Sequence, residues 1–411
     1  MNILMLTSVY PQPDDNLYKT TKTVKYYCDE WSKQGHKVIV IHNNSVFPKV
    51  FYYIPSFIKR IIEYKHGIQI PDVNSCKNLR RIENGVLIFR EKMIKLIPHS
   101  AFSKKEIEKQ GEKIISVLEK EEFVPDLIAA HWGNPQIALL GWLKNHYKRK
   151  FVSSIVFHND CEKKNIEKYN LIELIKSVDV VGCRSRIYGN KVKKRLNLSY
   201  DPFVCYSGFP DIIAEKINIK KVIESKKKNT ILYVGRLMKY KKVDTIIKAV
   251  SKCDNKDKVK LEIIGEGVCK VEILDLCKRN NIEKQVKFID KLSREEIFEY
   301  MKKSECLTMV SENETFGMVY IEAMLMGCIT IASKNSALDG VIKDGINGFL
   351  CEAGNFEELM IIYNKIKDMN KEEKEKIMFN AHKTALKFKD SELAKNYLDD
   401  IFSIYRINKG N

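Results

Sequence analysis

The sequence predicts an α/β protein made of two doubly wound, Rossmann-like domains. Short apolar strands alternate with helical stretches along the chain, which is the pattern of a parallel sheet covered by helices. The 411 residues suffice for two domains of ordinary size, each with its own buried core. Open α/β sheets bind their ligands beyond the carboxyl ends of the strands. We therefore expect the functional residues in the loops that follow the strands.

The beginning of the chain predicts one βαβ unit. Residues 1–8 are a short apolar run typical of a buried first strand, and a Pro- and Asp-rich loop follows at 9–16. A helix is expected at about 20–33, Gly35 ends it, and residues 37–42 predict the second strand. Strand, helix and strand in this order form a right-handed parallel unit, so the N-terminal domain should be doubly wound.

Residues 51–67 predict a basic amphipathic helix. Pro55 can open this helix and Gly67 can end it, and tyrosines flank it. One face of the helix is apolar and consists of Ile54, Phe57, Ile58, Ile61 and Ile62. The other face is basic and carries Lys59, Arg60 and Lys65. Such a helix either lies in a membrane interface, near an anionic membrane or a lipid-linked acceptor, or covers the protein core, which is the commoner case.

Two polar clusters follow strands in the rest of the first domain. His131 and Asn134 come directly after one predicted strand, and His158 comes directly after the next. Both clusters therefore lie where a doubly wound sheet binds its ligand. A lone histidine in such a loop is more often an ordinary hydrogen-bonded residue, which leaves the role of His158 open. The strands are expected at 126–130, 152–157 and 178–183, with helices at 104–121 and up to Lys148.

The composition divides the chain into four parts. Residues 1–210 form the first domain, and residues 211–229, which become rich in lysine and poor in large apolar side chains, predict a linker. Residues 230–388 form the second domain, and residues 389–411 form a final helix. Strands of the second domain are expected at 230–234, 260–264, 286–290 and 328–333.

The first strand of the second domain runs into a cationic loop. Gly235 follows the strand, and Arg236 and Lys241 lie between it and the next helix. Such a loop offers backbone N–H donors together with positive side chains, a combination that suits a diphosphate. The alternative is that its lysines are ordinary solvated charges, as we expect for Lys239 and Lys242.

One short helix is expected at the centre of the site. It should run from Phe316 to Met326, with Thr315 as its cap. The free N–H groups of Phe316, Gly317 and Met318 would then point outward at the positive end of the helix dipole. Helix starts of this kind bind phosphate groups, and glycine lets a ligand approach the backbone closely.

Two glutamates flank the start of this helix. Glu314 precedes it, and Glu322 lies eight residues further on, roughly 12 Å along a helix axis and about 80° around it. The two carboxylates are thus spaced to hydrogen-bond hydroxyls at both ends of a ligand longer than one phosphate. A sugar joined through a diphosphate to a ribose has that shape. The spacing alone leaves open that Glu322 is a solvated residue of the helix surface.

Charge and cysteine content limit the classes of protein to which the chain can belong. The formal net charge of +18 implies an acidic partner or substrate, but no compact strip of arginine and aromatic residues indicates nucleic acid. The eleven cysteines are odd in number and include no Cys-x-x-Cys pair, so they predict buried reduced thiols rather than disulfides or a zinc site. With no visible signal peptide or membrane span, we expect a cytoplasmic protein, with peripheral membrane contact as an option.

The motifs of the second domain resemble the signature of family 4 of the retaining GT-B glycosyltransferases. The resemblance rests on Gly235-Arg236-x-x-x-x-Lys241, on Glu314-x-Phe316-Gly317 and on Glu322-Ala323-Met324-x-x-Gly327. It covers most of the chain and is strongest in the second domain. It implies the GT-B fold, in which two Rossmann-like doubly wound domains face each other across a cleft and the last helix crosses back to the first domain.

The resemblance also implies roles for individual residues. In this family the glutamate that matches Glu314 contacts the donor sugar, and the one that matches Glu322 contacts the ribose hydroxyls. A histidine at the strand end that matches His158 contacts the sugar as well. Arg236 and Lys241 match the two cations that face the donor phosphates.

The chain departs from the family pattern at several positions. A Gly-Gly loop that the family often has after the first strand is missing near Asn16. We expect Asn16, His131 and Asn134 to line the cleft or to contact the acceptor. Further departures are Ser207, Pro210, Lys242, Asp290 and Asp339-Gly340.

The combined prediction is a hexosyltransferase-type enzyme that moves a sugar, with retention, from a nucleotide sugar to a hydroxyl of a glycan or lipid-linked acceptor. A UDP-sugar is the first choice of donor, and cell-surface polysaccharide or glycolipid assembly the expected setting. No cofactor and no metal are expected, because no Asp-x-Asp motif is present and Arg236, Lys241 and the helix start can neutralise the diphosphate. The alternatives are a GT-B nucleotide-sugar epimerase and a non-catalytic basic protein that binds nucleic acid or an anionic polymer.

Overall fold

The computed structural model divides the chain into two compact units. The first comprises residues 1–184, 188–205 and 393–411, and the second comprises 185–187 and 206–392. Each unit is a parallel sheet covered by helices, so the predicted α/β fold with two Rossmann-like domains is confirmed. The structure describes residues 1–11, 21–48, 53–55, 58, 79–95, 100–254, 258–312, 314, 316–336, 338 and 340–410.

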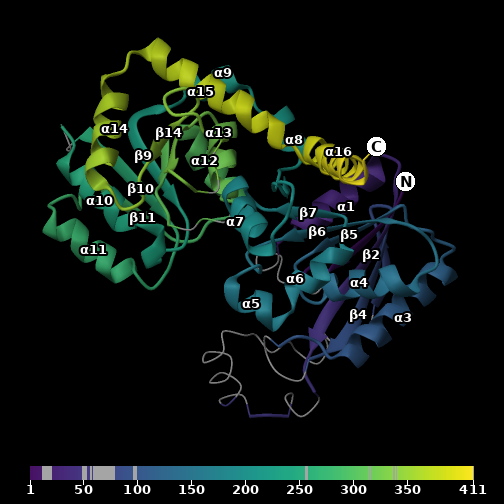
Figure 1. Cartoon of the computed structure of the whole chain (residues 1–411). Helices are drawn as coiled ribbons and strands as arrows, with labels where there is room; N and C mark the ends of the chain where they lie inside the picture. The colour runs from purple at the N-terminus through teal and green to yellow at the C-terminus, as the bar shows by residue number, and fades with distance from the viewer. Residues whose placement is uncertain are drawn as a thin grey trace. The chain divides into compact units, whose positions relative to one another are not determined.

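The first unit is built on one eight-stranded sheet with the order β3-β4-β2-β1-β5-β6-β7-β8 (Figure 1). All neighbouring strands are parallel except β3 and β4. The strands are β1 (Asn2–Thr7), β2 (Lys37–Val46), β3 (Leu79–Glu83), β4 (Val86–Ile94), β5 (Leu127–His131), β6 (Val152–Phe157), β7 (Val180–Cys183) and β8 (Phe203–Val204).

Helices cover both faces of this sheet. Figure 1 shows α3 and α4 together on one side, and α1 with α16 on the other, as right-handed crossovers in opposite directions require. The helices are α1 (Thr23–Lys33), α3 (Lys104–Lys120), α4 (Gln136–His146), α5 (Lys163–Lys168), α6 (Leu171–Leu174), α7 (Arg186–Leu196) and α16 (Asp390–Lys409).

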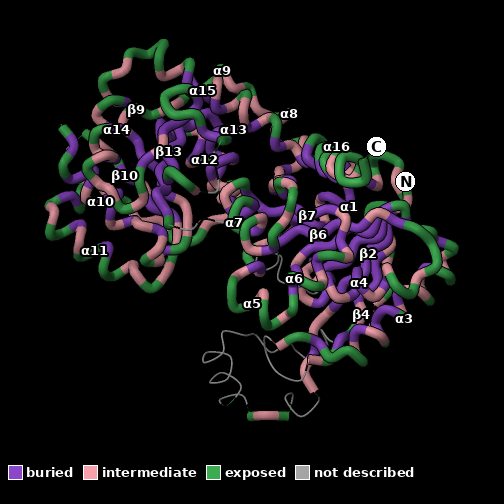
Figure 2. The backbone as a smooth tube through the Cα atoms, in the orientation of Figure 1, coloured by how far each residue is buried: buried purple, intermediate pink, exposed green. Residues whose placement is uncertain are grey.

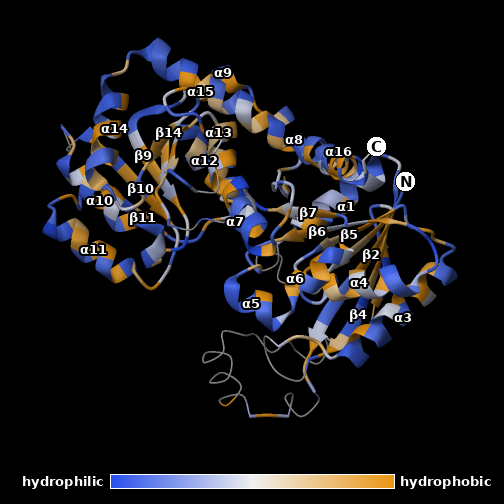
Figure 3. Cartoon of the chain, viewed as in Figure 1, coloured by the Kyte–Doolittle hydropathy of each residue, from blue (hydrophilic) through white to orange (hydrophobic). Residues whose placement is uncertain are grey.

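The central strands carry the core of the first unit. Residues 3–6 of β1 and 127–130 of β5 are fully buried, and Figures 2 and 3 show the central strands as buried and largely apolar. Strands covered on both faces need apolar residues in continuous runs rather than in alternation. This is why these two strands could be predicted within a residue or two of their bounds.

The β3–β4 hairpin was not predicted. Its strands pair in antiparallel fashion around Asn84 and Gly85, whose φ angles are +50° and +78°. An Asn-Gly pair with two positive φ values is the preferred two-residue hairpin turn, so the signal was present in the sequence. The predicted helix at 51–67 and the loop with Asn16 lie outside the described residues, except for four positions near Pro55.

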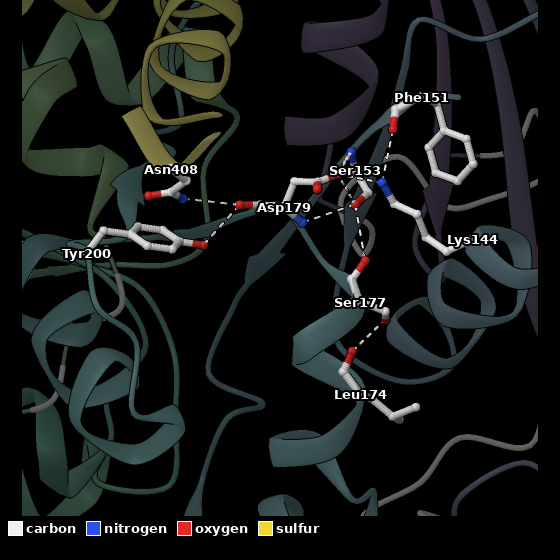
Figure 4. A network of polar contacts seen from close by, with 8 residues as sticks. All are labelled: Lys144, Phe151, Ser153, Leu174, Ser177, Asp179, Tyr200 and Asn408. Carbon is white, nitrogen blue, oxygen red and sulfur yellow. Dashed lines mark hydrogen bonds and ion pairs between the residues drawn. The ribbon is translucent and has the colours of Figure 1, made fainter. Parts of the chain in front are cut away.

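A buried carboxylate ties three elements together at the amino edge of the first sheet (Figure 4). Asp179, just before β7, accepts hydrogen bonds from the backbone N–H of Ser153 at 2.9 Å and from its hydroxyl at 2.8 Å. Lys144 of α4 donates to the same carboxylate at 2.6 Å. Only 13% of the Asp179 side chain is exposed. The position of this cluster, at the edge opposite the strand ends that precede His131 and His158, makes it structural.

We expect Asp179→Ala to lower the free energy of unfolding of the first unit by roughly 2–4 kcal/mol, because Lys144 and Ser153 lose their shared partner in a buried place. All three tryptophans, Trp31, Trp132 and Trp142, belong to this unit, so urea titration followed by tryptophan fluorescence reports on it.

Asp201→Ala is the control for the Asp179 substitution. Asp201 pairs with Lys193 at 2.8 Å, but 80% of its side chain is exposed, so its removal should cost less than about 0.5 kcal/mol. Equal effects of the two substitutions would contradict the structural role of Asp179.

The second unit is a six-stranded, fully parallel sheet with the order β11-β10-β9-β12-β13-β14. The predicted linker, 211–229, forms α8, α9 and the start of β9 and belongs to this unit. The strands are β9 (Lys227–Val234), β10 (Lys260–Ile264), β11 (Val286–Ile289), β12 (Ser304–Met309), β13 (Ile329–Ser333) and β14 (Phe349–Cys351). The helices are α8 (Asp211–Glu215), α9 (Ile219–Glu224), α10 (Val243–Lys252), α11 (Lys270–Arg279), α12 (Arg294–Lys303), α13 (Met318–Leu325), α14 (Phe356–Asp368) and α15 (Lys371–Ala385).

The described residues include ten of the eleven cysteines, all free, and nine of these are buried. Buried reduced thiols in the described part of the chain are what the sequence predicted. Among the helices that the structure describes, none combines the length and apolar character that a membrane crossing requires.

Candidate active site

The loop after β9 is a backbone platform at the carboxyl edge of the second sheet. Gly235 donates its N–H to the carbonyl of Ile264, at the end of β10, at 3.0 Å. A side chain at Gly265 would place its Cβ 2.0 Å from the carbonyl oxygen of Gly235, and one at Gly267 would lie 2.3 Å from that of Leu237. The two loops therefore touch through their main chains, which requires glycine at both positions. This contact fixes the path of the chain on either side of Arg236.

The structure brings two predicted site residues into direct contact. Lys241, whose side chain is only 11% exposed, donates to the carboxylate of Glu314, which is 16% exposed. The loops that carry them are also joined through the backbone, because Glu312 donates its N–H to the carbonyl of Tyr240 at 2.8 Å. The predicted phosphate contact and the predicted sugar contact thus form one ion pair.

Arg236 remains at the surface of this platform. Arg236 is exposed, and its guanidinium donates to the hydroxyl of Tyr240 at 3.1 Å. The hydroxyl of Tyr233 donates to the Arg236 carbonyl at 3.0 Å and holds the main chain below. Among the cations of this loop, Lys241 and Lys242 have carboxylate partners, the latter through Glu312 at 2.9 Å. Arg236 therefore carries positive charge with no carboxylate partner among the described contacts.

The short helix begins two residues later than predicted. α13 starts at Met318, and the residue before it, Gly317, has φ +74°, which favours glycine. The ring of Phe316 is buried against Tyr206 and Phe388, at centroid distances of 5.3 and 6.1 Å, so it anchors the turn and leaves only its backbone near the site. The proposed cap Thr315 lies outside the described residues. The free backbone N–H groups of the helix start therefore begin at Met318 rather than at Phe316.

Gly317 also makes room for Glu314. A Cβ at this position would lie 2.4 Å from the ring of Tyr320 and 3.2 Å from the Cγ of Glu314. The Tyr320 hydroxyl donates to the carbonyl of Met309 at 2.7 Å, which fixes that ring. Glycine is thus required between the glutamate and the first turn of α13.

Glu322 is largely, though not fully, buried and has a partner that the sequence reasoning missed. Arg294, at the start of α12, donates through its Nε and through a terminal nitrogen to the same oxygen of Glu322, both at 2.7 Å. Burial raises the pKa of the Glu322 carboxyl, and the charge of Arg294 opposes that rise. The reading of Glu322 as a solvated surface residue is therefore wrong. The two residues are 28 positions apart, and no local motif connects them.

In the first unit, His131 and His158 lie at neighbouring strand ends and form a hydrogen bond of 2.9 Å between Nδ1 of the first and Nε2 of the second. Trp132 adopts a left-handed backbone conformation with φ +67°, and its ring stacks on that of His158 at 4.0 Å and 16°. His131 is fully buried, whereas His158 is partly exposed. Trp132 is partly exposed as well, so the partly exposed members of this cluster are Trp132 and His158.

Asp160 holds the two histidine loops together, and the sequence reasoning gave it no role. Its carboxylate accepts from the backbone N–H of Gly133, after β5, and from that of His158, after β6, at 2.9 Å in the second case. Burial raises the pKa of this carboxyl. Asn134 donates from its side chain to the carbonyl of Ser100 at 3.3 Å, so its amide supports the loop.

The buried histidines predict a pH dependence of stability. Burial lowers the pKa of His131 to about 3, and the charge of Arg184 acts in the same direction. The folded pKa is below that of the unfolded chain, roughly 6.5. The unfolded chain therefore binds more protons in this range. Stability is fully present above about pH 6.5 and is lost as the pH falls towards 3.

We expect the first unit to lose roughly 2 kcal/mol from His131 between pH 6.5 and 5, at about 1.4 kcal/mol per pH unit. Urea midpoints from tryptophan fluorescence at several pH values measure this loss. His131→Gln should flatten the profile, because the group with the lowered pKa is gone. An unchanged profile in His131→Gln would contradict the assignment.

No group of metal-binding side chains occurs in the part of the chain that the structure describes.

The predicted site residues divide into two sets, one in each unit. Gly235, Arg236, Lys241, Glu314, Gly317, Met318 and Glu322 belong to the second unit, and His131, Asn134 and His158 to the first.

The two parallel sheets and the site loops at their carboxyl edges define the GT-B fold of glycosyltransferases. Solved structures agree: the crystal structure of Anabaena HepE in complex with UDP and glucose matches 98% of this chain and 100% of its own length with a TM-score of 0.61, at 18% identity. That degree of identity establishes the fold and nothing finer.

Sequence comparison adds the family of the second unit. Residues 215–384 match the family model described as Glycosyl transferases group 1. The match lies entirely within the second unit and covers less than half of the chain. This match contains the platform loop, both glutamates and the whole of α13.

Two curated relatives are similar over part of their length. The N-acetyl-alpha-D-glucosaminyl L-malate synthase of Bacillus anthracis is 25% identical over 260 residues, which are 59% of this chain and 65% of that protein. The N-acetylgalactosamine-N,N'-diacetylbacillosaminyl-diphospho-undecaprenol 4-alpha-N-acetylgalactosaminyltransferase of Campylobacter jejuni is 29% identical over 204 residues, 49% of this chain and 54% of that protein. The matched region thus spans less than two thirds of either relative.

Proposed function

We propose that the protein is a retaining glycosyltransferase of family 4 that transfers a sugar from a nucleotide sugar to a hydroxyl of a glycan or lipid-linked acceptor. The observation that carries the proposal is the ion pair of Lys241 and Glu314, formed between the platform loop and the start of α13. A group that bridges these two places has its phosphates at the cations and its sugar at the glutamate. The group 1 match over residues 215–384 supports the same reading.

The charges around the pair suit a leaving diphosphate. Arg236 and the N-terminal backbone of α13 provide positive potential, and Lys241 adds a charge-assisted donor beside Glu314. Negative charge grows on the diphosphate as the anomeric bond breaks, and preorganised donors stabilise that charge without a metal ion. The proposed reaction is accordingly metal-independent, and UDP is the proposed nucleotide, in line with the UDP complex of the structural relative.

The glutamates have separate proposed tasks. Glu314 contacts hydroxyls of the transferred sugar, and Glu322, held by Arg294, accepts from the ribose hydroxyls. His158 is proposed to contact the sugar as well. A buried carboxylate fixed by an arginine can discriminate a ribose from a deoxyribose, because an unpaired buried acceptor is costly.

The acceptor is proposed to be a lipid-linked or surface glycan, and the enzyme to work at the inner face of the membrane. The Campylobacter relative is named for a diphospho-undecaprenol substrate, and the net charge of +18 favours an anionic surface. Liposome flotation with and without anionic lipid tests this part by itself. Flotation with anionic vesicles is expected, and failure to float with them would contradict the proposed membrane contact.

The test of the activity is release of nucleotide from a panel of UDP-, GDP- and ADP-sugars in the presence of EDTA. We expect release with one donor class when the acceptor is supplied. Arg236→Ala should lower kcat/KM about a hundredfold, because it removes the unshared cation beside the diphosphate.

Lys239→Ala is the matched control for Arg236→Ala. Lys239 is an exposed cation of the same loop with no described partner, and its loss should change kcat/KM less than twofold. No release with any donor, or full activity in Arg236→Ala, would defeat the proposal. Conversion of the donor without an acceptor would instead indicate an epimerase.

A further inference from the structure

A chain of hydrogen bonds leads from the C-terminal helix to His158. The hydroxyl of Tyr397, on α16, lies 3.2 Å from Nε2 of His131, and Nδ1 of His131 lies 2.9 Å from Nε2 of His158. Tyr397 and His131 are buried, with exposed fractions of 2% and 0%. All three residues belong to the first unit, so the chain is complete within it.

Packing holds each member of the chain in place. The ring of Tyr397 stacks on His131 at 5.9 Å and 13°, and it also contacts Trp31 at 5.2 Å. The indole N–H of Trp31 donates to the carbonyl of Ala394 at 2.9 Å, which fixes α16 beside the cluster. On the other side, Trp132 stacks on His158. The imidazole of His158 therefore has little freedom to flip.

The chain links the proton positions of the two histidines. A neutral imidazole carries one N–H, so one of its nitrogens donates while the other accepts. The buried, electropositive surroundings keep both rings neutral, since burial and Arg184 lower both pKa values. The phenol O–H of Tyr397 is a stronger acid than the N–H of a neutral imidazole, so we assign Tyr397 as the donor to Nε2 of His131. His131 must then carry its proton on Nδ1 and donate it to Nε2 of His158.

We propose that Tyr397 and His131 are positioning residues that fix His158 in the tautomer protonated at Nδ1. His158 then presents an N–H donor, not an acceptor, at the only ring nitrogen that has no partner among the described residues. The benefit of a fixed donor rests on the proposed function, because the N–H of His158 would then donate to a hydroxyl oxygen of the bound sugar. Asp160 adds the matching backbone restraint on both loops.

The position of the proton is measured directly by long-range ¹H–¹⁵N NMR on the full chain with ¹⁵N-labelled histidine at pH 7.5. The chain has eight histidines, and the His158→Asn spectrum identifies the signals of His158. We expect a protonated Nδ1 and an unprotonated Nε2. A proton on Nε2 of His158 in the unmodified protein overturns the inference, and no substitution is needed to observe it.

Tyr397→Phe then tests whether the Tyr397 hydroxyl determines the tautomer of His158. It removes one hydroxyl and keeps the ring, and we expect the single His158 tautomer to become a mixture. Tyr200→Phe is the matched control in the same unit. Its hydroxyl accepts from the N–H of Val181 at 3.0 Å and donates to the carbonyl of Asp179 at 3.4 Å, as Figure 4 shows for the second contact. An unchanged His158 tautomer in Tyr397→Phe overturns the inference.

Enzyme kinetics separate this inference from the proposed function. Tyr397→Phe should lower kcat/KM about three- to tenfold, mainly through KM for the donor, whereas Tyr200→Phe should leave it unchanged. If the unmodified protein releases no nucleotide from any donor, the proposed function fails. The tautomer measurement still decides the inference in that case, since it depends on the fold alone.

Discussion

Glu314→Gln is expected to slow sugar transfer strongly while it tightens the binding of the nucleoside diphosphate. Glutamine keeps the shape of the side chain and still accepts from Lys241, but it removes the negative charge that now neutralises that lysine. The released charge acts on the diphosphate from a side chain that is only 11% exposed, where the field of a charge is weakly screened. Opposite effects on binding and on turnover distinguish this residue from a simple binding contact.

The two effects have different sizes. Loss of a charged contact to the sugar in the transition state should lower kcat by about a hundred- to a thousandfold. The gain in diphosphate affinity should be about fivefold, since solvation of the freed lysine cancels most of its attraction. Isothermal titration with UDP, GDP and ADP measures the second effect, and nucleotide release with the active donor measures the first.

Glu312→Gln is the internal control. Glu312 belongs to the same loop and pairs with Lys242 at 2.9 Å, but 46% of its side chain is exposed. Its neutralisation should change both quantities less than twofold. A weaker diphosphate complex in Glu314→Gln, or equal effects of both substitutions, would contradict the role given to the Lys241–Glu314 pair.

Arg294→Met should produce the second large effect. It keeps the apolar volume but leaves the Glu322 carboxylate without its cation, with only 13% of that side chain exposed. Breaking a fully buried pair costs about 3–5 kcal/mol, and the one-third exposure of Arg294 reduces this to roughly 2–3 kcal/mol. This cost falls on the free energy of unfolding. KM for the donor should also rise about thirtyfold, the equivalent of about 2 kcal/mol for the charged hydrogen bond that the displaced carboxylate no longer makes to the ribose, with a smaller change in kcat.

The loss in Arg294→Met should depend on pH. Burial already raises the pKa of Glu322, and removal of the arginine takes away the charge that opposes the rise. The carboxylate that accepts from the ribose is then present only at higher pH. Donor binding should recover as the pH increases and should be weakest at the acid end of the profile.

Two further variants complete this cycle. Adding Glu322→Gln to Arg294→Met should remove the pH dependence and restore much of the stability, because no unpaired charge remains. Lys302→Met is the control on the same helix, since Lys302 forms an exposed pair with Glu299 at 2.7 Å. A pH-independent Arg294→Met enzyme would contradict the pairing.

The sequence predicted most of the strands because their apolar runs are local signals. β10 matches its predicted bounds, and β1 and β6 match theirs within a residue or two. The start of α13 was placed two residues early, since a left-handed Gly317 ends the loop where an apolar pattern already continues. Helix boundaries of this kind depend on single φ angles that periodicity does not encode.

The contacts that complete the site were not predictable in the same way. Arg294 reaches Glu322 across 28 positions, and Tyr397 reaches His131 across 266. These pairings follow from the order of strands in each sheet and from the return of the last helix, which no local pattern specifies. The motifs thus singled out residues that the structure places at the strand ends, whereas the partners that hold those residues required the fold.

The position of Tyr397 has a consequence for folding during translation. The ribosome makes His131, Trp31 and the strands around them early, but Tyr397 and Ala394, which close over them, emerge only with the final helix. The aromatic side chains of the nascent N-terminal half therefore stay uncovered until the entire second unit has been translated. A messenger truncated shortly before codon 394 would leave a product that exposes this aromatic surface to chaperones and proteases.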